Sequence, residues 1–229
     1  MTPDIGYFFG LFDVATLAHT LYGIIAICLP SGLMLQFLVR SFRYHATYLL
    51  PQPHRGALES LPSIPLYGSP TIFLFVVMSI VLGAFTHIVW DSFTHRSGWV
   101  VQKLDILNQV VTILPGFSTE VFHLLQHFST ALGLSVIFIA YNKWLSLNGA
   151  RSDGISTPST DTWRYVLLTI ICVAALTIAV PSAYANSHSM TGEFLLKPFI
   201  FHLVLMSIAW FTGLFLVISI LVGRVRKNA

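Results

Sequence analysis

The sequence predicts an all-α, polytopic membrane helical bundle with about five transmembrane helices. Two compositional observations support this class: 55% of the 229 residues are hydrophobic and only 9% are charged, and the mean hydropathy is +0.77. About a quarter of the residues are charged in a typical soluble domain, so this chain has too few polar side chains to cover its surface in water. The third observation is a series of long apolar stretches along the chain.

Five stretches are almost free of Asp, Glu, Lys and Arg. Each is long enough to cross a bilayer, because about 20 apolar residues in a helix span the hydrocarbon core. Trp90, Trp144 and Trp163 stand at the ends of these stretches, where indole rings favour the headgroup layer. We expect one integral-membrane domain over residues 1–229. The predicted spans cover residues 14–39, 70–90, 121–144, 163–185 and 199–223.

The segments between the predicted spans differ in composition. Residues 50–70 are rich in proline, residues 91–120 have an amphipathic pattern, and residues 146–162 form a loop rich in Ser, Thr and Gly. Cys28 and Cys172 each lie inside an apolar stretch, which predicts buried thiols and no disulfide framework.

Basic residues are divided unevenly between the two sides that five spans define. The positive-inside rule makes the richer side cytoplasmic. We therefore expect a multi-pass membrane protein with a cytoplasmic carboxyl terminus and with residues 91–120 and 186–198 facing outward. The other side holds only Arg96, Lys103 and Lys197, whereas the richer side holds Arg40, Arg43, Arg55, Lys143, Arg151, Arg164, Arg224, Arg226 and Lys227.

Histidines and carboxylates gather on the predicted outward side. Ionisable groups at membrane depth are costly and usually mark function, so this grouping predicts a polar site. Of the nine histidines and nine carboxylates in the chain, the outward group comprises His19, His87, His95, His123, His127, His188 and His202 with Asp4, Asp13, Asp91, Asp105, Glu120 and Glu193.

The strongest motif is Thr86-His87-Ile88-Val89-Trp90-Asp91-Ser92-Phe93-Thr94-His95, at the outer end of the second span. If the helix continues to its end, His87, Asp91 and His95 share one helix face. Imidazole and carboxylate ligands together suit zinc or another divalent transition metal. His19 in the first span and Asp4 in the preceding turn lie on the same predicted side of the membrane, so they converge with the His87–Asp91 pair.

A second group of polar residues opens the third predicted span. Glu120 precedes His123 and His127, which are four residues apart and share a helix face. For a hydrolytic site we expect Glu120 or His127 to carry protons and His95 or His123 to position a developing anion. The alternative is that these side chains only pack or hydrogen-bond between helices.

Several of these words resemble the bacterial domain-of-unknown-function 4184 (DUF4184) membrane proteins, over residues 1 to about 145. The matching words are Thr2-Pro3-Asp4 with Tyr7 and Phe8, Ala18-His19-Thr20, Gly83 to His95 followed by Gly98-Trp99, and Leu125 to Thr130. The group is distantly similar to membrane-bound metal-dependent hydrolases and zinc-dependent phospholipase C-like proteins. That resemblance implies Asp4, His19, His87 and Asp91 as ligands and a location in the bacterial inner membrane. Members of the family usually have a Ser-His-Pro-like motif ahead of the Pro-Asp turn, so we expect either that Met1 is an internal methionine of a longer product or that the chain is a shortened homologue that lacks one ligand.

We therefore expect an outward-facing divalent-metal site, with zinc as the ion, that hydrolyses a phosphoester or similar bond in a lipid-linked or periplasmic substrate. The expected partner is membrane lipid, and the net charge of +3 is too weak and too dispersed for nucleic-acid binding. One alternative is a non-catalytic membrane scaffold or partner subunit whose His and Asp groups tie helices together. Another is a haem protein with axial ligands from His19, His87 and His202.

Overall fold

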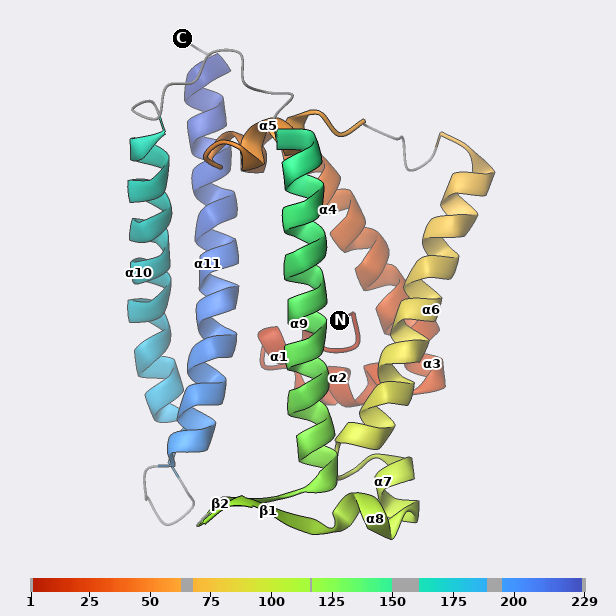
Figure 1. Cartoon of the computed structure of the whole chain (residues 1–229). Coiled ribbons are helices and arrows are strands. Elements are labelled where there is room, and N and C mark those ends of the chain that lie inside the picture. Colours follow the sequence, from red (N-terminus) through yellow and green to blue (C-terminus); the bar gives the residue numbers. More distant parts are fainter. Residues whose placement is uncertain (1, 63–67, 116, 150–160, 189–194, 228–229) are drawn as a thin grey trace. The chain divides into compact units, whose positions relative to one another are not determined.

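The computed structural model describes residues 2–62, 68–115, 117–149, 161–188 and 195–227, without the side chains of residues 117, 197 and 224–227 (Figure 1). The described residues are almost entirely helical, and this confirms the predicted all-α class. Five helices are long and apolar enough to cross a membrane, as predicted. They are Leu21–Tyr48, Pro70–Lys103, Val121–Asn148, Thr162–Ala185 and Pro198–Gly223.

The chain forms two compact units. The first comprises Met1–Leu35 and Ile64–Trp144, and the second comprises Gln36–Ser63 and Leu145–Ala229. Helix α4 (Leu29–Tyr48) runs from the first unit into the second. The other elements of the first unit are α1 (Ile5–Phe8), α2 (Phe12–Ala18), α3 (Leu21–Gly23), the π-helix η1 (Ile24–Cys28), α6 (Pro70–Thr94), α7 (Trp99–Lys103), α8 (Asp105–Asn108), β1 (Val110–Leu114), β2 (Phe117–Glu120) and α9 (Val121–Asn148).

The first spanning helix begins later than the expected residue 14. Residues Phe12–Ala18 form the separate helix α2, and the continuous helix starts at Leu21. The break lies at Thr20, whose backbone is extended and whose Oγ1 accepts a hydrogen bond from the Gly23 amide at 3.0 Å. Thr20 is therefore a helix N-cap. Because threonine is uncharged, a search for charge-free stretches passes over this break.

The short helices at the amino terminus fold back on themselves. Gly10 has φ +69°, a left-handed conformation that glycine adopts without strain, and it turns the chain from α1 into α2. The segment then packs on α6 through an apolar cluster of small side chains. The buried members of this cluster are Ala18, Ile24, Cys28 and Ala84, with Ile27, Val81 and Ile88 partly buried around them.

An N-cap residue and a proline mark the start of helix α6. Ser69 Oγ accepts a hydrogen bond from the Thr71 amide, and Pro70 occupies the first helical turn.

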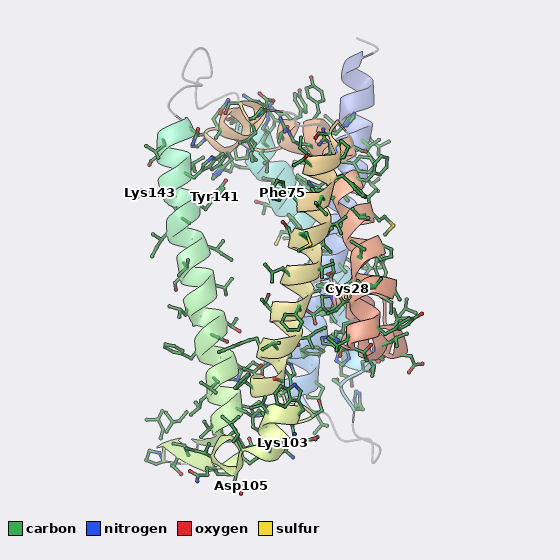
Figure 2. All side chains as sticks on the ribbon, turned by 90° about the vertical axis from the view of Figure 1, so that its right-hand side faces the viewer. Cys28, Phe75, Lys103, Asp105, Tyr141 and Lys143 are labelled. Carbon is green, nitrogen blue, oxygen red and sulfur yellow. The ribbon has the colours of Figure 1, made fainter. Side chains whose placement is uncertain are left out.

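Beyond the end of α6, helices α7 and α8 and the start of α9 share a second apolar cluster around Phe122. Figure 2 shows Lys103 and Asp105 beside the start of α9, whereas Tyr141 and Lys143 lie at its opposite end.

Strands β1 and β2 form a small antiparallel ribbon that the sequence analysis did not predict. Val110 pairs with Glu120 and Thr112 with Ser118, and the Thr112 and Ser118 hydroxyls are 2.9 Å apart. At the base, the Val121 amide donates to the Gln109 carbonyl at 3.0 Å. Strand β2 therefore passes directly into α9 without an intervening loop.

The second unit is built around two long helices, α10 (Thr162–Ala185) and α11 (Leu196–Lys227), which pack side by side (Figure 1). In the sequence, the shorter helix α5 (His54–Glu59) follows α4 and precedes the segment that returns to the first unit. Helix α10 buries one row of mostly small side chains at four-residue spacing: Ile171, Ala175, Ala179 and Ala183. The predicted loop 146–162 lies mostly outside the described residues.

A buried ion pair fastens the start of α10. Asp161 Oδ1 accepts a hydrogen bond from Arg164 Nη1 at 2.5 Å, and its Oδ2 accepts one from the Gln52 amide at 2.7 Å. Arg164 also donates through Nε to the Tyr48 carbonyl at 3.0 Å, and its guanidinium lies over the Trp163 ring at 4.4 Å. Burial alone would raise the pKa of Asp161, but the Gln52 amide and the two neighbouring cations, Arg164 and Arg55, hold it below its usual value.

Candidate metal site

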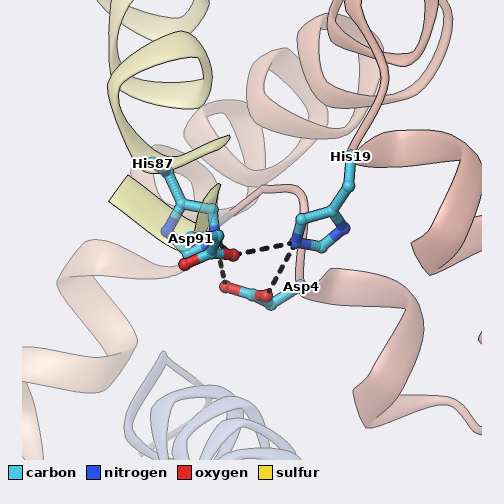
Figure 3. A group of neighbouring side chains, drawn as sticks. All are labelled: Asp4, His19, His87 and Asp91. Carbon is cyan, nitrogen blue, oxygen red and sulfur yellow. Dashed lines mark ion pairs between the residues drawn. The ribbon is translucent and has the colours of Figure 1, made fainter. Parts of the chain in front are cut away.

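Four side chains of the first unit meet beside α6 (Figure 3). Asp4 directly precedes α1, His19 directly follows α2, and His87 and Asp91 lie one turn apart in α6. One ligand atom from each of the four falls within 4.8 Å of all the others. Within the described part of the chain, this is the one group of three or more His, Cys, Asp or Glu side chains placed to hold a metal ion.

The two imidazoles alternate with the two carboxylates. His19 Nε2 lies 3.5 Å from Asp4 Oδ1 and 3.3 Å from Asp91 Oδ2. His87 Nε2 lies 3.1 Å from Asp4 Oδ2 and 3.2 Å from the same Asp91 oxygen. The four side chains are between 18% and 33% exposed, so the group is largely shielded and still reachable. Each nitrogen faces both acids.

A backbone carbonyl orients the His19 ring. Nδ1 of His19 lies 2.7 Å from the Ala15 carbonyl oxygen. A carbonyl oxygen only accepts hydrogen bonds, so Nδ1 carries the proton and donates it. In the neutral form that a metal ligand requires, the ring would present an unprotonated Nε2 toward Asp4 and Asp91. Histidines that bind metals are commonly held in this way, with the second ring nitrogen donating to a carbonyl or carboxylate.

The opposing nitrogen, Nε2 of His87, is enclosed by protein. Among the described residues it has no partner in hydrogen-bonding geometry, although both carboxylates are close enough in distance. Buried polar nitrogens are normally satisfied. An atom in this position suits a ligand that lies between the carboxylates better than a hydrogen bond to either one.

Neighbouring charged groups shift the pKa values of Asp4 and His19. Burial alone would raise the pKa of Asp4, but the close imidazoles of His19 and His87 hold it far below its ordinary range. Hydrogen bonds to Asp4 and Asp91 raise the pKa of His19 to about 10, against a smaller opposing effect of burial. Without a metal, His19 is therefore protonated at neutral pH and forms ion pairs with the acids.

Two glycines allow the amino-terminal segment to reach α6 in this arrangement. A Cβ on Gly6 would lie 2.8 Å from the Leu11 carbonyl oxygen and from the Ala15 nitrogen, which is closer than real Cβ atoms come. A Cβ on Gly23 would lie only 1.9 Å from the Leu17 carbonyl oxygen. Glycine at both positions therefore lets neighbouring turns approach closely enough to bring Asp4 and His19 together.

His95 lies outside the four-residue group. Helix α6 ends at Thr94, and the extended backbone of His95 takes it off the face shared by His87 and Asp91. The chain turns here toward Gly98, where a Cβ would lie 2.4 Å from the Ser92 carbonyl oxygen. His95 Nδ1 remains 3.7 Å from Asp91 Oδ1, beside the group but not within it.

The predicted residues of the third span form a neighbouring polar group. Glu120 accepts hydrogen bonds from Arg96 Nη2 at 2.5 Å and from His123 Nδ1 at 3.1 Å. The His123 and His127 rings are stacked, with centroids 6.4 Å apart. Gln126, which the sequence analysis passed over, lies with its Nε2 3.5 Å from His95 Nε2. His95 thus stands between the two groups.

Two predicted residues lie in the second unit. His202 donates through Nδ1 to the Pro198 carbonyl of its own helix at 2.8 Å, and His188 donates to the Tyr184 carbonyl at 3.0 Å. Glu193 lies outside the described residues. The sequence also offered no sign of the Ala15 carbonyl that orients His19 or of Arg96 as the partner of Glu120, because both depend on how the chain folds back.

Comparison with known proteins places the whole chain in one family. The model of a domain of unknown function, DUF4184, matches residues 1–223, which is nearly the full length of the chain. No curated protein and no solved structure matches it. The match includes all four residues of the metal-ligand group and both units of the fold. The chain therefore belongs to the DUF4184 family.

Proposed function

We propose that this protein binds a divalent metal ion, with zinc as the expected ion, through Asp4, His19, His87 and Asp91. The observation that carries the proposal is the convergence of four ligand atoms from three separate segments within 4.8 Å. Two neutral imidazoles and two carboxylates are ligands that zinc accepts in proteins. The two carboxylate charges also equal the charge of a divalent ion.

The spacing of the ligand atoms supports the same assignment. Two ligands that each lie about 2.0–2.1 Å from a tetrahedral zinc ion are about 3.4 Å from one another. The four nitrogen-to-oxygen distances in the group run from 3.1 to 3.5 Å. These distances use both oxygens of Asp4 and are close to that separation, and one ligand atom from each residue lies within 4.8 Å of all the others.

We propose further that the site hydrolyses a phosphoester or related bond. A divalent ion held by these four residues would supply Lewis acidity and would make a water molecule nucleophilic near neutral pH. His95 lies next to Asp91 and Gln126, in a position to exchange a proton with a reacting group. Glu120 and His123 form a second hydrogen-bonded pair nearby that can carry a proton. Arg96 supplies a positive charge for an anionic substrate.

The proposed substrate is lipid-linked or periplasmic. The metal-ligand group is carried partly by α6, a helix able to span a membrane, and the positive-inside distribution of Lys and Arg favours an outward-facing location. The reaction class is the one implied by the sequence resemblance to membrane-bound metal-dependent hydrolases. These observations together favour a substrate that reaches the site from the outer membrane surface.

Elemental analysis of the detergent-purified protein tests the metal assignment. We expect about one zinc per chain in the wild type and a loss of most of it in His87→Ala. His188→Ala is the matched control, because His188 lies in the second unit and bonds its own helix. A wild-type protein without metal, or equal metal in His87→Ala and wild type, would overturn the proposal.

A specific observation favours a second, structural role for the same group. In the absence of metal, the imidazoles and carboxylates pair with one another and tie the amino-terminal segment to α6. In a scaffold protein, the four residues would serve only to form these ion pairs. Zinc would then leave the thermal stability of the wild type unchanged, whereas a metal protein is stabilised by its ion through mass action.

A further inference from the structure

The β1–β2 ribbon of the first unit exposes apolar side chains on both of its faces. Successive residues of a strand point to opposite sides, yet the side chains of β1 are exposed along its whole length. Val110 is 67% exposed and Leu114 is 63% exposed, and Val111 and Ile113 are also exposed. A ribbon that faced water would carry polar residues on at least one face.

Polarity changes along the ribbon from its base to its tip. At the base, Glu120 is bonded to Arg96 and pairs with Val110. Val111–Thr119 follows toward the tip, and then the Thr112–Ser118 hydroxyl pair. The tip end of β1 holds Ile113 and Leu114. From Ser97 to Thr119 the only charged residues are Lys103 and Asp105, and neither belongs to a strand. The polar side chains of the ribbon that the structure describes, Thr112, Ser118, Thr119 and Glu120, therefore lie away from the tip, whereas the tip end of β1 is apolar.

The position of the ribbon relative to the spanning helices is fixed within the first unit. Strand β2 runs directly into α9, so the base of the ribbon marks the end of a membrane-spanning helix. The ribbon extends sideways from the foot of α9 and does not continue its axis (Figure 1). Because α9 crosses the bilayer, a ribbon that leaves its end sideways follows the membrane surface.

A neighbouring pair of side chains has the character of a membrane interface. Trp99 is exposed on α7, and Lys103 Nζ lies 5.8 Å from the centre of its ring. Indole rings concentrate at the level of the lipid headgroups, where a lysine can extend its ammonium to water or phosphate. Leu104 and Ile106, which follow, are exposed as well. The apolar surface therefore continues from α7 to the ribbon.

We infer that residues 99–114 form an interfacial membrane-binding surface, with the tip of the β1–β2 ribbon inserted at the boundary between lipid headgroups and acyl chains. An isolated two-stranded ribbon is only marginally stable in water, and contact with lipid would cover its exposed side chains. The outer edges of the strands still need hydrogen-bond partners. The headgroup region supplies them, whereas the hydrocarbon core does not, so the ribbon lies in the surface and does not span the membrane.

The test uses the full chain reconstituted into phosphatidylcholine–phosphatidylglycerol vesicles. In a Cys172→Ala background, which removes the exposed native thiol, Leu114→Cys at the tip and Thr119→Cys near the base are each labelled with an environment-sensitive fluorophore. The background protein without an added cysteine measures any labelling of the buried Cys28. We expect several-fold stronger quenching of the Leu114 label than of the Thr119 label by doxyl groups on the acyl chains, and the reverse order with aqueous iodide.

Ile113→Cys gives a second tip position, so the result does not depend on one substitution. Strong iodide quenching at both tip positions would overturn the inference and make the ribbon an aqueous loop. Protection from both quenchers, with crosslinking between chains at Leu114, would overturn it in favour of a second copy on this surface. The metal content of the labelled proteins is measured in parallel, because this inference depends on the membrane spans and not on the metal site.

Discussion

Each unit pairs carboxylates with side chains that can carry a positive charge. The two groups differ in how deeply they are buried and in whether their polar atoms are already hydrogen-bonded. In the second unit, Asp161 and Arg164 are only 8% and 7% exposed, and the oxygens of Asp161 accept from Arg164 and the Gln52 amide. In the first unit the partners of the carboxylates are histidines, the group is less buried, and the contacts are 3.1 to 3.5 Å long.

The difference follows from the chemistry of the cations. Arginine has five N–H donors, no acceptor, and keeps its charge at any accessible pH. It can therefore close an ion pair but cannot bind a metal. A neutral histidine has one donor and one acceptor, so His19 can donate to the Ala15 carbonyl and still present a lone pair to an ion. The second unit holds a structural ion pair, and the first holds a group of candidate metal ligands.

The largest effect should come from breaking the ion pair in the second unit. Removing one partner of a buried pair leaves an uncompensated charge, so Arg164→Ala should lower the free energy of unfolding by about 3–5 kcal/mol. Thermal unfolding in detergent measures the change. The double variant Asp161→Asn with Arg164→Met is the matched control and should lose much less, because no buried charge remains. Metal content should stay at the wild-type value in both proteins.

Zinc should stabilise the protein through the first unit. At a free zinc concentration 100 times its dissociation constant, the ion should add about 2.7 kcal/mol to the free energy of unfolding. A chelator should reverse the gain. The same titration of Asp91→Asn measures binding elsewhere on the protein. Equal stabilisation of the variant and the wild type would remove the distinction between the two units.

The close backbone approach at Gly23 offers a way to disturb the first unit without changing a ligand. Gly23→Ala places a methyl group against the Leu17 carbonyl, and overpacking of this kind costs about 1–3 kcal/mol. We expect lower stability and weaker zinc binding. Gly83→Ala in α6 has open space around its Cβ and should stay within about 1 kcal/mol of the wild type. Equal zinc affinity in all three proteins would show that the approach does not position His19.

The smallest effect is a dependence of zinc affinity on pH. Asp4 and Asp91 raise the pKa of His19 to about 10 in the metal-free protein, so zinc must displace a proton from His19 at neutral pH. Zinc affinity should therefore rise about tenfold per pH unit for each proton released, up to about that pKa. Calorimetry in two buffers of different ionisation enthalpy counts the protons. Titration of a chain with His19→Gln should release fewer protons than the wild type.

The pH dependence of the metal-free fold has the opposite sign. A raised pKa in the folded state means that protonated His19 stabilises the fold fully below about 6.5, the pKa of an unperturbed histidine. This contribution is lost as the pH rises toward 10. Raising the pH should therefore weaken the metal-free protein while it strengthens zinc binding. Thermal unfolding of the chelator-treated protein across this range checks the sign.

The sequence predicts the membrane class and the spanning helices well, because both depend on composition and on the length of apolar stretches. It also identifies the four residues that the structure brings together, since a His and an Asp four apart on a helix must share a face. The end of α6 at Thr94 was harder to foresee, because it depends on the contact between Gly98 and Ser92. The β1–β2 ribbon was missed because exposed apolar residues do not produce the alternating pattern of a half-buried strand.

The fold-back of the amino-terminal segment also determines when the site can form. Asp4 and His19 leave the ribosome first, whereas His87 and Asp91 follow only after the first spanning helix and the whole proline-rich connector. During synthesis, Asp4 and His19 therefore lack their two partners until α6 enters the membrane. Metal capture by this protein would then follow the synthesis of α6, and zinc binding would report that the first two spanning helices have been inserted in their correct order.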